Sequence, residues 1–217
     1  PGSWIPTAAG SQLLYDLLEG LCDATTPLST GAAIQAALDS DRENGRPLVL
    51  AGQEITYTTS LDVDGGSGGK LFDMGWSDTV EESSDNARLA STLIYNGTKA
   101  SNEYAIRHKR SEFGYWNMNI QGKSTADIIA GTGTRTPRGI YIVRDAAVGT
   151  GKIDMRCVRG SGFDVFIDSG DSLAAANCDE SSYYDVYSYK NGTFYRSNNI
   201  QGLSQKFYNL RISHTDT

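Results

Sequence analysis

The sequence predicts an all-β solenoid, a fold in which short strands coil into stacked layers. Two observations support this prediction. The 217 residues are 39% hydrophobic and 21% charged and include 24 Gly and 12 Tyr, which suits many short strands joined by tight turns better than a helical bundle. Strand-like segments also recur at intervals of 21 residues. A fixed repeat of this length is typical of a solenoid in which each unit contacts its neighbours.

The repeat is clearest when the segments that begin at positions 162, 183 and 204 are aligned. This alignment predicts that Val165, Val186 and Phe207 form an inward-facing ladder on consecutive layers. Cys157 and Cys178 are also 21 positions apart, so we expect them inside the solenoid as apolar fillers and not as a disulfide. A leucine-rich repeat is the main competing fold, but its leucines and its asparagine at a constant offset are missing.

The N-terminal part of the chain is predicted to be helical. Residues 1–3 are interpreted as a cloning remnant, and residues 4–28 as an N-terminal helical segment. Within it, Ser11–Leu21 places its leucines on one face of a helix that Ser11 can cap. A second helix should begin near Thr30 and end before Gly45.

The rest of the chain, residues 29–217, is predicted to form the solenoid. Three strands should follow the second helix at 47–50, 55–58 and 61–63. Residues 64–92 lack a regular period and are interpreted as a loop insertion. No C-terminal cap is recognisable before Thr217, so we expect the natural chain to continue.

One stretch resembles a known family. Residues 33–63, AIQAALDSDRENGRPLVLAGQEITYTTSLDV, are similar to the opening of the pectate-lyase-like superfamily, in which a helix, a Gly-containing turn, a strand ending near a small-Gly pair and a further strand begin the coil. Ala51-Gly52 stands at the position of that pair, whereas Gln53-Glu54 replace the aromatic residue that often follows it. The resemblance implies a right-handed parallel β-helix with short N-terminal capping helices, of the kind found in phage tailspikes.

Charge and composition argue against several classes of partner. The net charge of -7 is spread along the chain without a basic stripe, which disfavours nucleic acid. No apolar run reaches the roughly 18 residues of a membrane helix, so we expect no membrane insertion. The three Cys lack metal-ligand spacing, and we predict neither a metal site nor a cofactor.

The candidate catalytic residues are Asp164 and Asp185. If they face outward on adjacent layers, their carboxylates would lie near the roughly 5 Å separation of a retaining glycosidase. The alternative is that they serve solubility, as surface acids commonly do. The polygalacturonase motifs Asn-Thr-Asp, Gly-His-Gly and Arg-Ile-Lys are absent, and His108 and His214 are interpreted as solvent-facing.

The candidate carbohydrate-binding residues are Phe166, Tyr187, Tyr208 and Tyr189. If the Val165 ladder points inward, the first three form an exposed aromatic ladder that could stack against sugar rings. The alternative is that the ladder has the opposite parity and belongs to the core, because a shift of one residue reverses every side chain.

Three functions fit these observations. The first is a phage tailspike-like virion appendage domain that works as a homotrimer and recognises a bacterial cell-surface polysaccharide. The second is a secreted or virion-borne polysaccharide lyase or glycoside hydrolase acting on an acidic or capsular glycan. The third is a structural β-helix shaft or adaptor.

Overall fold

The computed structural model describes residues 28–40, 45, 47–64, 68–72, 91–143, 152–170, 180–198 and 204–213. Every structural statement below refers to this part of the chain. The predictions for the Ser11–Leu21 helix, Cys178, His214 and most of the 64–92 insertion lie outside it.

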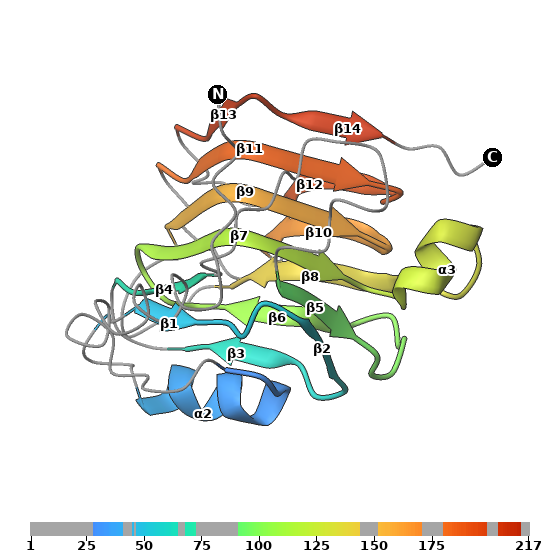
Figure 1. Ribbon diagram of the computed structural model, residues 1–217. Coiled ribbons are helices and arrows are strands. Elements are labelled where there is room, and N and C mark those ends of the chain that lie inside the picture. The colour runs from blue at the N-terminus through green and yellow to red at the C-terminus, as the bar shows by residue number, and fades with distance from the viewer. Residues whose placement is uncertain are drawn as a thin grey trace, which may run out of the picture.

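Two helices and two β-sheets make up the described fold (Figure 1). The helices are α2 (Gly31–Ser40) and α3 (Thr125–Ala130). The nine-stranded sheet contains β1 (Pro47–Val49), β2 (Glu54–Tyr57), β4 (Lys70–Phe72), β5 (Ser91–Tyr95), β7 (Phe113–Gln121), β9 (Ile153–Ser161), β11 (Ser182–Tyr189), β13 (Lys206–Tyr208) and β14 (Arg211–Ser213). The five-stranded sheet contains β3 (Leu61–Val63), β6 (Tyr104–His108), β8 (Thr136–Ile142), β10 (Phe163–Ser169) and β12 (Thr193–Ser197).

All described strand pairs are parallel. From β7 to β13 the chain alternates between the two sheets, so that each pass adds one strand to each sheet, as Figure 1 shows. We call each pass a layer: β1 to β3 form layer 1, β4 to β6 layer 2, β7 and β8 layer 3, β9 and β10 layer 4, β11 and β12 layer 5, and β13 and β14 layer 6. The predicted all-β class is therefore confirmed, and so are the three strands expected directly after α2.

The predicted stacking of residues 21 positions apart is wrong. Val165 pairs with Thr193 in the five-stranded sheet, whereas Val186 pairs with Val158 in the other sheet. Phe207 pairs with Tyr183. Successive layers are 28 positions apart between β9 and β11 and between β10 and β12. The 21-residue spacing compared β10 of one sheet with β11 of the other, because both sheets have similar alternation of apolar and polar residues. Between β11 and β13, which share a sheet, the true offset is 24 positions.

A corner divides β7, β9 and β11 of the larger sheet into two arms, and the same corner separates β13 from β14. Asn117, Cys157, Asp185 and Asn209 occupy equivalent positions on layers 3 to 6 and all have a positive φ of 51° or 52°. Asn and Asp tolerate this left-handed conformation better than most residues, because their short polar side chains bond locally. Cys157 is therefore a half-buried corner residue, and its predicted place inside the core is wrong.

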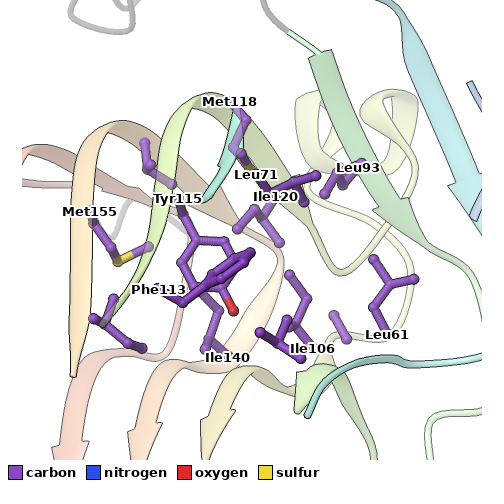
Figure 2. Close-up of a cluster of buried hydrophobic side chains, with 14 of the residues drawn as sticks. Leu61, Leu71, Leu93, Ile106, Phe113, Tyr115, Met118, Ile120, Ile140 and Met155 are labelled. Carbon is purple, nitrogen blue, oxygen red and sulfur yellow. The ribbon is translucent and has the colours of Figure 1, made fainter. Parts of the chain in front are cut away.

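The core lies between the two sheets. Figure 2 shows residues from layers 1 to 4 that point toward one another, among them Leu61, Ile106, Tyr115 and Ile140. At one end of the stack, α2 covers layer 1 with its buried Ile34 and Leu38. Such a cover keeps water from the apolar end of the first layer.

Several local predictions are tested by these contacts. The Thr30 hydroxyl accepts a hydrogen bond from the Ala33 amide at 3.1 Å, which confirms the expected start of the second helix. His108 is fully buried in β6, so its predicted solvent exposure is wrong. Neither described helix has the length and apolar character needed to cross a bilayer.

Candidate ligand-binding face

The predicted aromatic ladder does not form one surface. Phe166 is completely buried, with its ring centre 5.9 Å from that of Phe163, and it fills the space above Gly160. Its predicted exposure is therefore wrong. The alternative stated in the sequence analysis, that this residue faces inward and belongs to the core, is therefore correct for Phe166.

Tyr187 and Tyr189 lie on the outer face of β11 but are engaged by a cation. The Arg159 guanidinium lies 5.3 Å from the Tyr187 ring centre and 4.4 Å from that of Tyr189. Tyr187 is only 4% exposed, and Tyr189 is half-buried. These two rings offer little surface to a ligand.

The two candidate catalytic carboxylates are not stacked. Asp164 is exposed on β10 in the five-stranded sheet, whereas Asp185 is the corner residue of layer 5 in the nine-stranded sheet. Asp185 accepts a hydrogen bond from the Asn209 side chain. Their catalytic role stays a prediction, without the adjacent placement that suggested it.

A different ladder of outward-facing side chains lies on the other arm of the nine-stranded sheet, the arm that precedes the corner residues. The strand register aligns Phe72, Trp116, Arg156, Tyr184 and Tyr208 on layers 2 to 6. We call these five residues the column. All are at least partly exposed, and Tyr208 is the member that the sequence predicted.

Aromatic rings and cations are stacked along the column. The Lys70 ammonium lies 3.6 Å from the Trp116 ring centre. The Arg156 guanidinium lies 4.8 Å from Trp116 and 5.4 Å from Tyr184. The Tyr184 and Tyr208 rings are parallel within 2°, with centres 4.6 Å apart. The ring faces are therefore largely covered by their neighbours, and the column presents ring edges and polar ends to a ligand.

Asp154 fixes the centre of the column. Its carboxylate accepts hydrogen bonds from the Trp116 indole at 3.1 Å and from Arg156 Nε at 2.9 Å. Within the described part of the chain, the Arg156 Nη groups form no further hydrogen bond, and the side chain is 52% exposed. A guanidinium held in this way can donate two parallel hydrogen bonds to a carboxylate or phosphate.

An open cavity of about 330 Å³ adjoins the column and is lined in part by Asp154, which binds Trp116 and Arg156 of the column. Its charged groups alternate in sign, because Lys152 Nζ lies 3.3 Å from Glu180 and 3.7 Å from Glu112. Ser182 adds a hydroxyl group to the lining. The column and the cavity together form a polar face that crosses several layers.

The outer face of the five-stranded sheet is occupied by internal ion pairs. Asp62 binds Arg107 through two hydrogen bonds, and Asp168 binds both Arg138 and Arg196. These pairs satisfy the charged groups within the protein, so this face offers fewer free donors than the column does. A second open cavity of about 380 Å³, lined mainly by hydroxyl groups and acids, lies at its edge beside Ser60.

Trp116 and Arg156 were missed by the sequence reasoning. The signal that could have found them is the 28-residue offset, which joins Arg156 to Tyr184. Trp116 is 40 positions before Arg156, because an insertion that contains α3 lengthens layer 3.

No family model matches the chain, and neither the curated proteins nor the solved structures contain a significant match.

Proposed function

We propose that this chain is a right-handed parallel β-helix from a phage tailspike-like virion appendage, and that its column binds a bacterial cell-surface polysaccharide. The two parallel sheets and the alternation of the chain between them support the fold. The segment that resembles the pectate-lyase-like opening corresponds to α2, β1, β2 and β3, in the expected order. The homotrimer implied by that resemblance belongs to the same proposal.

The observation that carries the binding proposal is Arg156 between Trp116 and Tyr184. Parallel strands place like positions about 4.8 Å apart, so an extended glycan that runs along the column meets a new side chain on every layer. The phenolic and guanidinium groups donate to sugar hydroxyls, and Arg156 adds a site for an acidic substituent. The contacts to Asp154 and to both rings hold Arg156 in place before the ligand arrives, which reduces the entropy lost on binding.

The experiment compares wild-type protein with Arg156→Gln against a panel of purified capsular and O-antigen polysaccharides immobilised on a sensor surface. We expect the substitution to weaken binding about tenfold or more, because a charge-assisted hydrogen bond contributes about 1.5–3 kcal/mol. The matched control is Arg107→Gln, which removes a guanidinium from the outer face of the other sheet. Equal affinity of wild type and Arg156→Gln for the bound polysaccharide would refute the proposed site.

Cleavage of the glycan is a second candidate function, favoured by the carboxylates of Asp154, Glu112 and Glu180 around the cavity beside the column. A glycosidase needs two carboxyl groups at either side of the scissile bond. The test measures new reducing ends after incubation with each polysaccharide that binds. Loss of activity in Glu180→Gln would assign cleavage to the cavity, and loss in Asp164→Ala or Asp185→Ala would assign it to the residues predicted from the sequence.

A structural shaft or adaptor is the remaining function. It predicts no binding to any polysaccharide of the panel by either the wild type or the variants.

A further inference from the structure

Two segments with the same sequence, Asn-Gly-Thr, lie in different surroundings. Asn96-Gly97-Thr98 follows β5, and Asn191-Gly192-Thr193 joins β11 to β12. Both lie where the chain leaves the nine-stranded sheet for the five-stranded one. The same three residues therefore occur in two environments of one molecule, so the effect of the fold on their chemistry can be separated from that of the local sequence.

Asn191 is buried, and its side chain is held by hydrogen bonds. It is 2% exposed. Its Nδ2 donates to the Gly160 carbonyl at 2.8 Å and to Ser188 Oγ at 2.9 Å, and its Oδ1 accepts from the Phe163 amide at 2.9 Å. The amide of Gly192 donates to the Phe163 carbonyl at 2.9 Å. The side-chain amide and the backbone nitrogen that follows it are therefore held apart.

Asn96 lacks these restraints. Its side chain is exposed and bonds to no other described residue, whereas its backbone amide donates to the Tyr57 carbonyl at 2.8 Å. The Gly97 amide also donates no hydrogen bond to a described residue. Position 97 has to be glycine, because a Cβ atom there would lie 2.3 Å from the Thr58 carbonyl oxygen. No side chain at position 97 can therefore shield the nitrogen of that residue.

We propose that Asn96-Gly97 is a site of spontaneous deamidation in the folded protein, and that the fold protects Asn191-Gly192. The Gly97 nitrogen forms a bond to Asn96 Cγ, the bond from Cγ to Nδ2 breaks, and ammonia leaves with the amide proton. Water then opens the resulting succinimide at one of its two carbonyl groups, which gives aspartate or isoaspartate. Water is the only co-reactant, and solvent supplies it at an exposed residue.

The difference between the two sites follows from the movement that the reaction requires. The asparagine side chain has to swing over the next backbone nitrogen, and that nitrogen has to lose its proton. At Asn96 this movement breaks no hydrogen bond to a described residue. At Asn191 it breaks the bonds to Gly160, Ser188 and Phe163, so the reaction there waits for a local opening of the structure.

The two products differ in their effect on the structure. Aspartate keeps the length of the backbone and adds one exposed negative charge. Isoaspartate adds a methylene group to the backbone directly before Gly97, which already lies close to the Thr58 carbonyl and the Tyr95 ring. Thr58, Tyr95 and Thr98 line the open cavity of about 380 Å³ beside Ser60. Isoaspartate therefore changes the wall of this cavity.

Peptide mass spectrometry of the full chain, kept folded at mildly alkaline pH, measures both rates. We expect Asn96 to deamidate about tenfold faster than Asn191 or more. The matched control is the same chain unfolded in guanidinium chloride, where the two rates should become similar because Gly-Thr follows both asparagines. Equal rates in the folded chain, or an unreactive Asn96 in the folded chain alone, would overturn the proposal. The Asn44-Gly45 pair gives a separate peptide.

Hydroxylamine, which cleaves the chain at a succinimide, provides a second measurement. In an Asn44→Gln background, the folded protein should give fragments 1–96 and 97–217. Asn96→Gln should abolish them, because glutamine does not form the five-membered ring, and its exposed side chain should leave the fold intact. Cleavage after Asn191 that is as extensive as cleavage after Asn96 would contradict the protection by the fold. Neither measurement depends on the polysaccharide proposal.

Discussion

Asp168 is a buried carboxylate held between two guanidinium groups. It is 1% exposed on the outer face of β10, where it accepts from Arg196 at 2.6 and 3.0 Å and contacts Arg138 Nε at 3.0 Å. Asp62 makes a similar two-bond pair with Arg107 on the same face, but its side chain is 34% exposed. The two carboxylates therefore differ in their access to solvent and in the number of guanidinium groups that they contact.

We expect Asp168→Asn to lower the free energy of unfolding by about 2–4 kcal/mol, because it leaves two partly buried guanidinium groups without a counter-charge. Asp62→Asn is the control and should cost about 1 kcal/mol or less, since water screens an exposed pair. Urea unfolding followed by circular dichroism measures both values. Equal losses in the two variants would contradict the importance of burial.

His108 is a buried imidazole that must stay neutral in the folded protein. Its Nδ1 lies 2.9 Å from the Tyr115 hydroxyl, and its Nε2 has no hydrogen-bond partner. Burial lowers the pKa of His108 from 6.5 to about 3, and the positive charge of the neighbouring Arg110 acts in the same direction. Protonation therefore favours the unfolded chain.

The free energy of unfolding should fall as the pH drops below about 6.5 and continue to fall toward pH 3. In this range the unfolded chain binds a proton that the folded chain excludes, so the stability from His108 is present above pH 6.5 and lost below it. At pH 4.5 the loss should be on the order of 2–3 kcal/mol. The measurement is urea unfolding at several pH values, with His108→Gln as a variant that does not titrate. A constant difference between wild type and variant across this range would rule out the effect.

At the scale of an element, Gly160 of β9 makes room for the ring of Phe166 in the other sheet. A Cβ atom at position 160 would lie 2.3 Å from that ring. Gly160→Ala should therefore destabilise the protein by about 1–3 kcal/mol through overpacking. Phe166→Leu should relieve part of the clash, so the double variant should lose less stability than the two single losses combined. Strictly additive losses in thermal unfolding would contradict this contact.

The same element shows how far the sequence could lead. Alternation of polar and apolar residues was enough to predict short strands and an all-β fold. It could not assign Phe166 to the core, because both Phe166 and Ile167 face inward there and the simple alternation fails. The corner residues Asn117 and Cys157 also interrupt the inward and outward alternation of side chains within their strands. They do so through a left-handed backbone conformation that the alternation of polar and apolar residues does not reveal.

The candidate site depended on the register even more strongly. Tyr208 was predicted to be exposed, and it is. Trp116 and Arg156 were not aligned with it, because the spacing between layers varies: Trp116 lies 40 positions before Arg156, Arg156 28 before Tyr184, and Tyr184 24 before Tyr208. The lengths of the loops between strands decide which residue of the next layer is aligned with Tyr208. These lengths vary from layer to layer, so no fixed repeat in the sequence reveals them.

At the scale of the whole molecule, the two ends of the stack differ. Figure 1 shows α2 at one end and β13 and β14 at the other. α2 buries Ile34 and Leu38 against layer 1, whereas all three residues of β13 are exposed. Between these ends, β7 and β9 have paired strands on both sides.

This asymmetry predicts a gradient of local stability along the stack. Amide hydrogen exchange of the dilute protein should be slowest in β7 and β9, because their opening disrupts two neighbouring strands, and fastest in β13 and β14. β3, beneath α2, should exchange more slowly than β14, although both are three-residue strands at an end of their sheets. Mass spectrometry of peptides from deuterated protein measures these rates. Equal protection of β3 and β14 would show that the helical cover contributes no local stability, and faster exchange in β9 than in β14 would contradict the order of layers itself.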